Sequence, residues 1–416
     1  MKMMKKIAGG VTFARGFRAA DCAAGIKYRN RTDMAMIACD VPCAAAGVFT
    51  TNVVKAAPVR WDMDVVRKKG KAQAVVVNAG IANAATGAEG LRLCRETAEA
   101  AGRLLGIAPE LVLVGSTGVI GPVIPLDRIS DGIAQMVPKL SATPEAGTAA
   151  SRAIMTTDTV NKEFAVEFEL PAADGAGNVT VRLGGMSKGS GMIHPNMSTM
   201  LGYVTTDCAI APALLDKALR TVAADTFNMI SVDGDTSTND TLLVLSSGLA
   251  GNAEITEENE SYLIFRDALE SVCRDLAIRM AGDGEGATRL MEMQVIHADT
   301  KENARLLARS VVASSLVKAM VYGKDANCGR ILCAMGYAGP FFDPDRVDLF
   351  LQGKSETLCF CRDGRVLPFD EEKALAIMSE DAIRFLADMK MGDQEATAWG
   401  CDLTYDYVKI NGDYRS

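Results

Sequence analysis

The chain has 416 residues, 49% of them hydrophobic, and a formal net charge of −8 at pH 7. This length predicts two or three domains, or one large two-lobed unit, with a sizeable apolar core. The acidic balance argues against a nucleic-acid or anionic-membrane partner. The sequence contains no run of roughly eighteen uncharged apolar residues, so we expect no membrane span. The N-terminal stretch lacks the apolar segment of a secretory signal, so we expect a cytoplasmic protein.

In the first half of the chain, short apolar segments alternate with a helical pattern. Residues 33–40 and 44–50 are expected to form a pair of strands, and 72–80 a buried strand that ends in a glycine turn. A second strand with a glycine turn is expected at 111–118. Residues 163–170 alternate cleanly, and the turn "PAADGAGN" leads back into 179–183, which predicts a hairpin. An amphipathic helix is indicated by apolar residues at three- and four-residue steps, namely Leu91, Cys94, Ala98, Ala101 and Leu105.

The second half begins with a strand through "MLGYVTTD" and a helix over about 211–226. A further helix is expected to start at Asp299, with Glu302 in a capping-box position, and to run to about Val321. Hairpin-like strands at 347–361 and a strand-rich tail follow. A long helix that stops at "GDGEG" is indicated by a buried stripe of Tyr262, Phe265, Leu269, Val272, Leu276 and Met280. With no Pro/Ser-rich linker between the halves, the pattern predicts an α+β or layered α/β body whose halves pack together.

The eleven cysteines and two histidines show no metal-ligand spacing. No CxxC pair occurs, and an odd number of irregularly spaced cysteines is not a disulfide framework. We expect these cysteines to be small buried apolar residues in a reducing compartment, and we expect no structural metal site.

Conventional nucleophilic catalysis has little support in this sequence. A Ser–His or Cys–His pair would need His194 or His297, the only histidines in the chain. His297 is expected near a strand end as a partnered structural histidine, and His194 lies in an HPN turn. No GxSxG motif is present.

A different nucleophile is suggested by "KGSGMIHPNMSTMLGYVTTD", residues 188–207, which combines glycine turns with hydroxyl residues. A threonine can act without histidine when its own α-amine, with a pKa of ~7.7–8.0, serves as the base. Such an amine appears if Thr199 Oγ attacks the carbonyl of Ser198 and the chain is cut between them. A purely structural threonine in a turn is the alternative that these residues leave open.

Further motifs run from one end of the chain to the other: "GGVTFARGFRAA", "AAAGVFTTNVVKAAPV", "VVNAGIANAATG", "GSTGVIG", "MTTDT", "SVDGDTSTNDT", "AGDGEGATRL", "GKDANCGRI" and "AWGCDLTYDYVKINGDYRS". Together with residues 188–207 they resemble, in order, the blocks of the ornithine acetyltransferase (glutamate N-acetyltransferase) family of arginine biosynthesis. Thr199 matches the family nucleophile, and Ser198 stands where the family usually has alanine.

The resemblance assigns roles residue by residue. Thr117 and Gly118 in "GSTGVIG" correspond to the family's oxyanion hole, which needs donors aimed at a tetrahedral intermediate. Thr156 and Lys188 resemble substrate-binding residues, with Lys188 suited to an α-carboxylate. The remaining matches to substrate contacts are Thr199 itself, Glu285 in the "GDGEGA" loop, and Asn411 and Ser416 in the C-terminal tail.

The resemblance also implies an architecture and a reaction. It implies a layered αββα body formed jointly by an alpha chain of 1–198 and a beta chain of 199–416, assembled as a heterotetramer of two of each. The reaction would be ping-pong transfer of acetyl from N2-acetyl-L-ornithine to L-glutamate through an acetyl-Thr199 intermediate, without a cofactor. The motifs do not distinguish members that also use acetyl-CoA.

Two alternatives differ from this reading in what they do with the acyl group. A self-cleaved amidohydrolase or aminopeptidase of the same architecture would pass it to water. An uncut, non-catalytic amino-acid-binding protein would form no acetyl-enzyme at all.

Overall fold

The computed structural model of the protein describes residues 4–194 and 200–413, and it contains two compact units. Unit 1 comprises Met1–Gly189, Asn196–Ala223 and Thr236–Leu276, and unit 2 comprises Ser190–Pro195, Ala224–Asp235 and Ala277–Ser416. Ser198, Thr199 and Ser416 lie outside the described residues. Each unit is therefore assembled from segments on both sides of the predicted cut.

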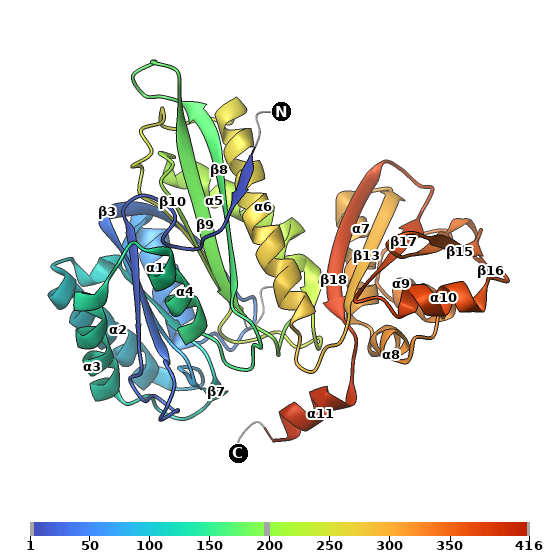
Figure 1. Cartoon of the computed structure of the whole chain (residues 1–416), viewed down its shortest axis with the longest axis horizontal. Helices are drawn as coiled ribbons and strands as arrows, with labels where there is room; N and C mark the ends of the chain where they lie inside the picture. Colours follow the sequence, from blue (N-terminus) through green and yellow to red (C-terminus); the bar gives the residue numbers. More distant parts are fainter. Residues whose placement is uncertain (1–3, 195–199, 414–416) are drawn as a thin grey trace. The chain divides into compact units, whose positions relative to one another are not determined.

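Unit 1 is built on one large mixed sheet that includes β3, β8, β9 and β10 (Figure 1). In the described part of the chain its strand order is β1-β8-β9-β10-β12-β3-β4-β6, with β2 beside β3. Its strands are β1 (Lys5–Ile7), β2 (Phe17–Cys22), β3 (Met34–Phe49), β4 (Lys71–Asn78), β6 (Val112–Ser116), β8 (Lys162–Pro171), β9 (Asn178–Lys188), β10 (Leu201–Thr206) and β12 (Thr241–Ser246). A small separate pair is β5 (Ile81–Ala82) with β7 (Val119–Ile120).

Helices pack against this sheet through alternating strand residues. In β4, Val75 and Val77 enter one apolar core, whereas Ala74 and Val76 enter a second core with residues of α2 and α3. A strand that is buried on both faces reads as a continuous apolar run, which explains the pattern of "AVVVN". The helices are α1 (Ala57–Lys69), α2 (Gly87–Leu105), α3 (Leu126–Met136), α4 (Pro144–Ala153), α5 (Pro212–Asp225) and α6 (Glu260–Gly282).

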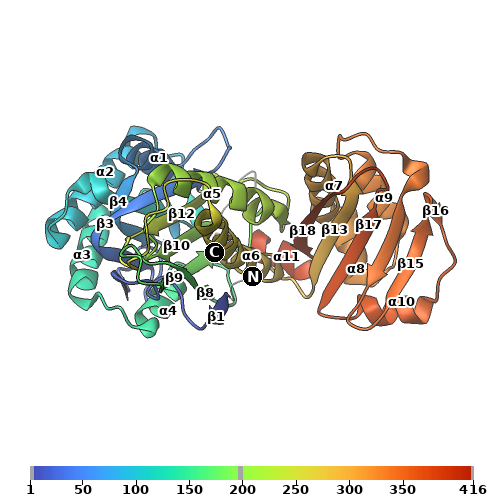
Figure 2. The ribbon, with the colours of Figure 1, turned by 90° about the horizontal axis from the view of Figure 1, so that it is seen from above.

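Unit 2 has its own sheet, with the order β11-β18-β13-β17-β14-β15-β16 among the described residues, and α7 packs on β13 and β18 (Figure 2). The strands are β11 (Ile230–Ser231), β13 (Leu290–Ala298), β14 (Asp348–Gln352), β15 (Thr357–Arg362), β16 (Arg365–Val366), β17 (Ala382–Asp388) and β18 (Gln394–Cys401). The helices are α7 (Lys301–Ala313), α8 (Ser315–Gly323), α9 (Cys328–Gly336), α10 (Glu371–Met378) and α11 (Tyr405–Gly412). Single 3₁₀ turns occupy Pro109–Leu111, Val137–Lys139, Phe227–Met229 and Pro344–Arg346.

Mixed sheets with segregated helices confirm the α+β class, and most predicted elements are confirmed. β8 and β9 form the predicted hairpin, with Lys162 opposite Ser187 and Pro171 opposite Asn178. Helices α2, α5 and α6 match the predicted ones, and β14 and β15 form the later hairpin.

Two predictions are wrong. Residues 33–40 and 44–50 belong to a single strand, β3, which passes exposed Pro42 through a register shift between Ala38 and Cys43. A proline cannot donate to the ladder, so the strand accommodates it as a bulge and does not end there.

The helix predicted from Asp299 to Val321 is two helices, α7 and α8. Its N-cap is Thr300, whose side chain accepts from Asn303 N at 3.1 Å, and not Asp299. Ser314 ends α7 and caps α8 by accepting from Val317 N. Among the described helices, none by itself is long and apolar enough to cross a membrane; only α7 and α8, bent by 56° at their break, pass that test as a pair.

Candidate active site

A buried lysine at the end of β9 gathers two of the predicted threonines. Lys188 is 2% exposed, and its Nζ donates to Thr156 Oγ1 at 2.9 Å and to Thr117 Oγ1 at 3.3 Å. Thr117 follows β6 and Thr156 follows α4, so three separate segments of unit 1 meet here. Because Lys188 donates to the Thr117 oxygen, the Thr117 hydroxyl hydrogen is directed to another acceptor.

Asp158 lies between two ammonium groups in the same cluster. Its carboxylate accepts from Lys162 Nζ at 2.7 Å and from the Gly189 N–H at 2.7 Å, and it lies 3.9 Å from Lys188 Nζ. Burial alone raises the pKa of this carboxyl, but Lys188, Lys162 and the Gly189 N–H outweigh burial and lower the pKa to about 2.

The charged groups of this cluster are buried. Two ammonium groups, on Lys162 and Lys188, face one carboxylate, on Asp158, and all three side chains are almost completely buried. An ammonium group in a water-poor site attracts a carboxylate more strongly than it would at the surface.

The turn after β6 presents a backbone donor beside Thr117. Thr117 N donates to Asn78 O and Val119 N to Gly80 O, both at 3.1 Å, while the Gly118 N–H between them has no acceptor among the described residues. Gly118 has φ +129°, and a Cβ there would collide with the backbone of Gly80. Only glycine fits this turn. Because the Gly118 N–H has no acceptor among the described residues, it is available to a ligand oxygen.

The strand that follows Thr199 in the sequence is fixed on both sides. Leu201 is paired with Lys188 of β9 and with Thr241 of β12. Met200 O accepts from Thr241 N at 3.1 Å, and Met200 N donates to Asp240 Oδ1 at 3.2 Å. The residue that directly follows the predicted nucleophile is therefore held next to the lysine cluster.

Sequence reasoning did not single out Asp240, which occurs within the quoted "SVDGDTSTNDT". The side chain is fully buried, and its Oδ2 has no hydrogen-bond partner. Burial raises its pKa well above the usual value, against smaller lowering effects of the Met200 N–H, the Thr50 hydroxyl and Lys188. A single Asp in a loop gives no local signal, because its importance comes from the pairing of β12 with β10.

In unit 2, the predicted residues Glu285 and Asn411 are in contact. Asn411 Nδ2 of α11 donates to Glu285 Oε2 at 2.6 Å. Glu285 is 7% exposed; its N donates to Ser190 O at 2.8 Å, and its carboxylate lies directly against Gly191. A side chain at position 191 would displace this carboxylate.

The segment that precedes the predicted cut is held by Asp233, which sequence reasoning also did not single out. The Asp233 carboxylate accepts from Met192 N at 2.6 Å, Ile193 N at 2.8 Å and Tyr407 Oη at 3.1 Å. Two adjacent backbone N–H groups on one carboxylate fix the direction of the chain. His194 Nδ1 lies 3.1 Å from Ser231 Oγ, and burial, followed by Arg309, lowers the pKa of His194 to about 4.

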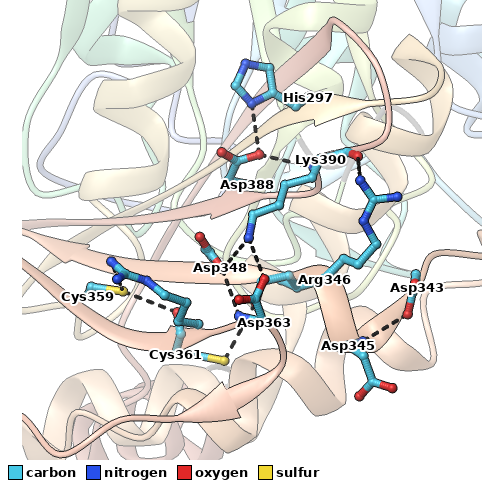
Figure 3. Close-up of polar contacts among 12 residues, drawn as sticks. His297, Asp343, Asp345, Arg346, Asp348, Cys359, Cys361, Asp363, Asp388 and Lys390 are labelled. Carbon is cyan, nitrogen blue, oxygen red and sulfur yellow. Dashed lines mark hydrogen bonds and ion pairs between the residues drawn. The ribbon is translucent and has the colours of Figure 1, made fainter.

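A second polar cluster in unit 2 is structural (Figure 3). His297 Nδ1 lies 2.8 Å from Asp388 Oδ1 near the end of β13, which confirms the expected partnered histidine. Lys390 Nζ bridges Asp348 and Asp363 at 2.8 Å each and ties β14 to the turn after β15. Each charged group in this network already has a partner.

Comparison with known proteins matches the whole chain to one family. The ArgJ family profile covers residues 18–416. The arginine biosynthesis bifunctional protein ArgJ of Symbiobacterium thermophilum is 52% identical over 99% of this chain and 100% of its own, and that of Caldanaerobacter subterraneus is 47% identical over 99% and 100%. The solved ornithine acetyltransferase of Mycobacterium tuberculosis, complexed with ornithine, is 40% identical over 48% of this chain and 100% of that one, with a TM-score of 0.42. On the profile match and the full-length identities, this chain belongs to the ArgJ family.

Proposed function

We propose that this chain cuts itself between Ser198 and Thr199, and that Thr199 then carries acetyl from N2-acetyl-L-ornithine to L-glutamate. As a member of the ArgJ family, the chain is an acetyltransferase enzyme of arginine biosynthesis. The self-cleavage, the intermediate and the residue roles are the proposed part.

Self-cleavage would proceed through an ester. Thr199 Oγ bonds to the Ser198 carbonyl carbon, the C–N bond to Thr199 breaks, and the hydroxyl proton ends on the released amine. Water then hydrolyses the ester, which leaves a carboxylate on Ser198 and restores the Thr199 hydroxyl. The product is a threonine whose own amine can act as a base near neutral pH.

Acetyl transfer would then take two displacements. The Thr199 amine accepts the Oγ proton as Oγ bonds to the acetyl carbonyl carbon, and that proton passes to the leaving α-amine of ornithine. The α-amine of glutamate next bonds to the acetyl carbon of the Thr199 ester. Its proton returns to Thr199 Oγ, and N-acetylglutamate leaves.

The Lys188 cluster supports the roles of three residues. The Gly118 N–H and the Thr117 hydroxyl would donate to the oxyanion of each tetrahedral intermediate. Lys188, whose ammonium group is held by Thr156 and Thr117, would bind the substrate α-carboxylate. This cluster, beside the strand that begins at Leu201, is the single observation that carries the proposal.

The Glu285–Asn411 contact supports a role in binding the cationic side chain of ornithine. The Glu285 carboxylate would pair with the ammonium group, and Asn411 would orient that carboxylate from α11. Ser416, at the end of the same tail, is proposed to complete the enclosure of the substrate.

The proposed mature enzyme has an alpha chain of 1–198 and a beta chain of 199–416 in a layered αββα body. Two copies of each chain would form a heterotetramer in the cytoplasm. The interleaving of strands from both chains in the sheet of unit 1 supports a body that the two chains build jointly. The naming of the relatives as bifunctional favours acetyl-CoA as an additional donor.

The test is the denatured intact mass before and after brief exposure to N-acetylornithine. The proposal expects two species of roughly 21 and 23 kDa, dividing 44.1 kDa in the ratio 198:218, with one acetyl added to the larger species. The T199A variant should remain a single chain without an adduct, whereas T221A, on the exposed side of α5, should cleave normally. An intact parent chain, or an acetyl group on another residue, would refute the proposal.

A further inference from the structure

The loop before β12 contacts both parts of the proposed acyl-transfer site. Asn239 Nδ2 donates to Ser116 O at 2.8 Å, and Ser116 directly precedes Thr117. The next residue, Asp240, accepts the Met200 N–H at 3.2 Å, and Met200 directly follows Thr199. One dipeptide therefore holds the turn of the oxyanion donors and the start of the strand behind the nucleophile.

The dipeptide is itself rigidly placed. Thr50, at the end of β3, donates its N–H to Asp240 O at 3.1 Å and its hydroxyl to Ser237 O at 2.7 Å. Asn239 is 3% exposed and Asp240 is fully buried. Neither side chain can be satisfied by water, so its protein partner determines its position.

We propose that Asn239 and Asp240 are positioning residues that set the geometry between the oxyanion donors and the nucleophile. Asn239 does so through the Ser116 carbonyl, and Asp240 does so through the Met200 amide. Both act on the reacting groups through the backbone, and neither touches the substrate. The expected loss of activity rests on the proposed function. The expected change in hydrogen exchange rests only on the contact of Asp240 with the residue before β10.

The buried position of Asp240 disfavours its charged form. A buried carboxylate needs several donors, yet Oδ1 has the Met200 N–H and Oδ2 has none.

The activity test compares D240A, D240N and N239A in the full chain. D240A and N239A should each lower kcat and the rate of self-cleavage roughly tenfold or more, with KM within about twofold, because positioning is lost and substrate contacts remain. D240N keeps a side-chain oxygen that can accept the Met200 N–H, so it should stay within about threefold of the parent. The matched control D235N lies in the same loop, is exposed, and should behave like the parent.

Three outcomes would overturn the proposal. An inactive but folded D240N would mean that the anionic carboxylate is required; this variant also decides the question if D240A does not fold. A rise in KM with unchanged kcat would mean substrate binding. A double variant N239A/D240A whose loss equals the product of the single losses would mean two independent residues, since residues that act as a unit are not additive.

Hydrogen exchange separates this inference from the proposed function. In the T199A background, where no cut and no acetyl-enzyme form, D240A should accelerate exchange of the Met200 amide at least tenfold, and D240N should not. If the parent neither cleaves nor acetylates, the proposed function fails and this comparison still decides on Asp240. Equal exchange in T199A and T199A/D240A would overturn the role of Asp240 while leaving the proposed function intact.

Discussion

Replacement of Asp158 by asparagine should destabilise the chain far more than the same change at the surface. Two ion pairs have the same i,i+4 spacing and nearly the same length. Asp158–Lys162 measures 2.7 Å with both side chains 0% exposed, and Asp64–Lys68 measures 2.6 Å with side chains 66% and 70% exposed. D64N is therefore the exposed control, at an ion pair of the same spacing and nearly the same length.

The magnitude follows from the contacts of Asp158. The drop of its pKa from 3.8 to about 2 corresponds to about 2 kcal/mol of favourable interaction with the charged form. One carboxylate oxygen accepts the N–H of Gly189 and the other accepts the N–H of Thr156. Whichever way an asparagine amide is turned, its NH₂ group therefore faces one of these N–H donors. We expect the free energy of unfolding to fall by about 3–5 kcal/mol in D158N and by less than about 1 kcal/mol in D64N.

The assay is thermal unfolding in the T199A background, so that every variant is a single uncut chain. D158N should lower the midpoint on the order of 5 °C, and D64N should leave it nearly unchanged. Because the folded-state pKa is depressed, the contribution of Asp158 is fully present well above 3.8 and is lost as pH falls through about 2. The difference in unfolding midpoint between D158N and its T199A background should accordingly be smaller at pH 3 than at pH 5. Equal midpoints for D158N and D64N at pH 7 would refute the reasoning.

Three further predictions concern the turn, the tail and the segment before the cut. G118A should abolish activity and lower the unfolding midpoint. G121A, with a positive φ of 109° but open space around its Cβ position, should lower the free energy of unfolding by only about 1 kcal/mol. Equal losses of stability in the two variants would argue against the steric role of Gly118. Y407F, which removes the hydrogen bond to Asp233, should raise KM for N-acetylornithine roughly fivefold with kcat nearly constant, as steady-state kinetics would show. His194 should remain neutral at pH 5, and because its pKa is lowered to about 4 its contribution to stability should decline as pH falls below 6.5; an NMR titration midpoint near 6.5 would contradict this.

Local patterns account for the elements that the sequence predicts correctly. The alternation in 163–170 and the glycine-rich turn after it are complete within one hairpin, so the structure of β8 and β9 follows from neighbouring residues. The errors arise where tertiary contacts decide. Pro42 resembles a strand end, but pairing with β4 and β12 carries β3 past it as a bulge. Ser314 is an unremarkable residue in a helical pattern, yet it turns the chain by capping α8.

The candidate site divides in the same way. Lys188, Thr117 and Thr156 were predicted by motif, and the structure brings them together across up to 71 residues of sequence. Asp240 and Asp233 were not predicted, because an aspartate in a polar loop usually lies in solvent. Their contacts arise from the parallel pairing of β10 with β12 and from the approach of 192–193 to Asp233, which are long-range events without a local signature.

The strand order in unit 1 has a consequence for a cut chain. β10 and β12 follow Thr199 in the sequence, yet they lie between β9 and β3, which precede it. The six residue pairs that join Leu201–Thr206 to β9, and the six that join Thr241–Ser246 to β3, would survive hydrolysis of a single bond outside the ladder. The two fragments could then separate only by opening the sheet in its middle. A cut chain should therefore migrate as two bands after denaturation but as one particle in native buffer, and removing either fragment should unfold the other.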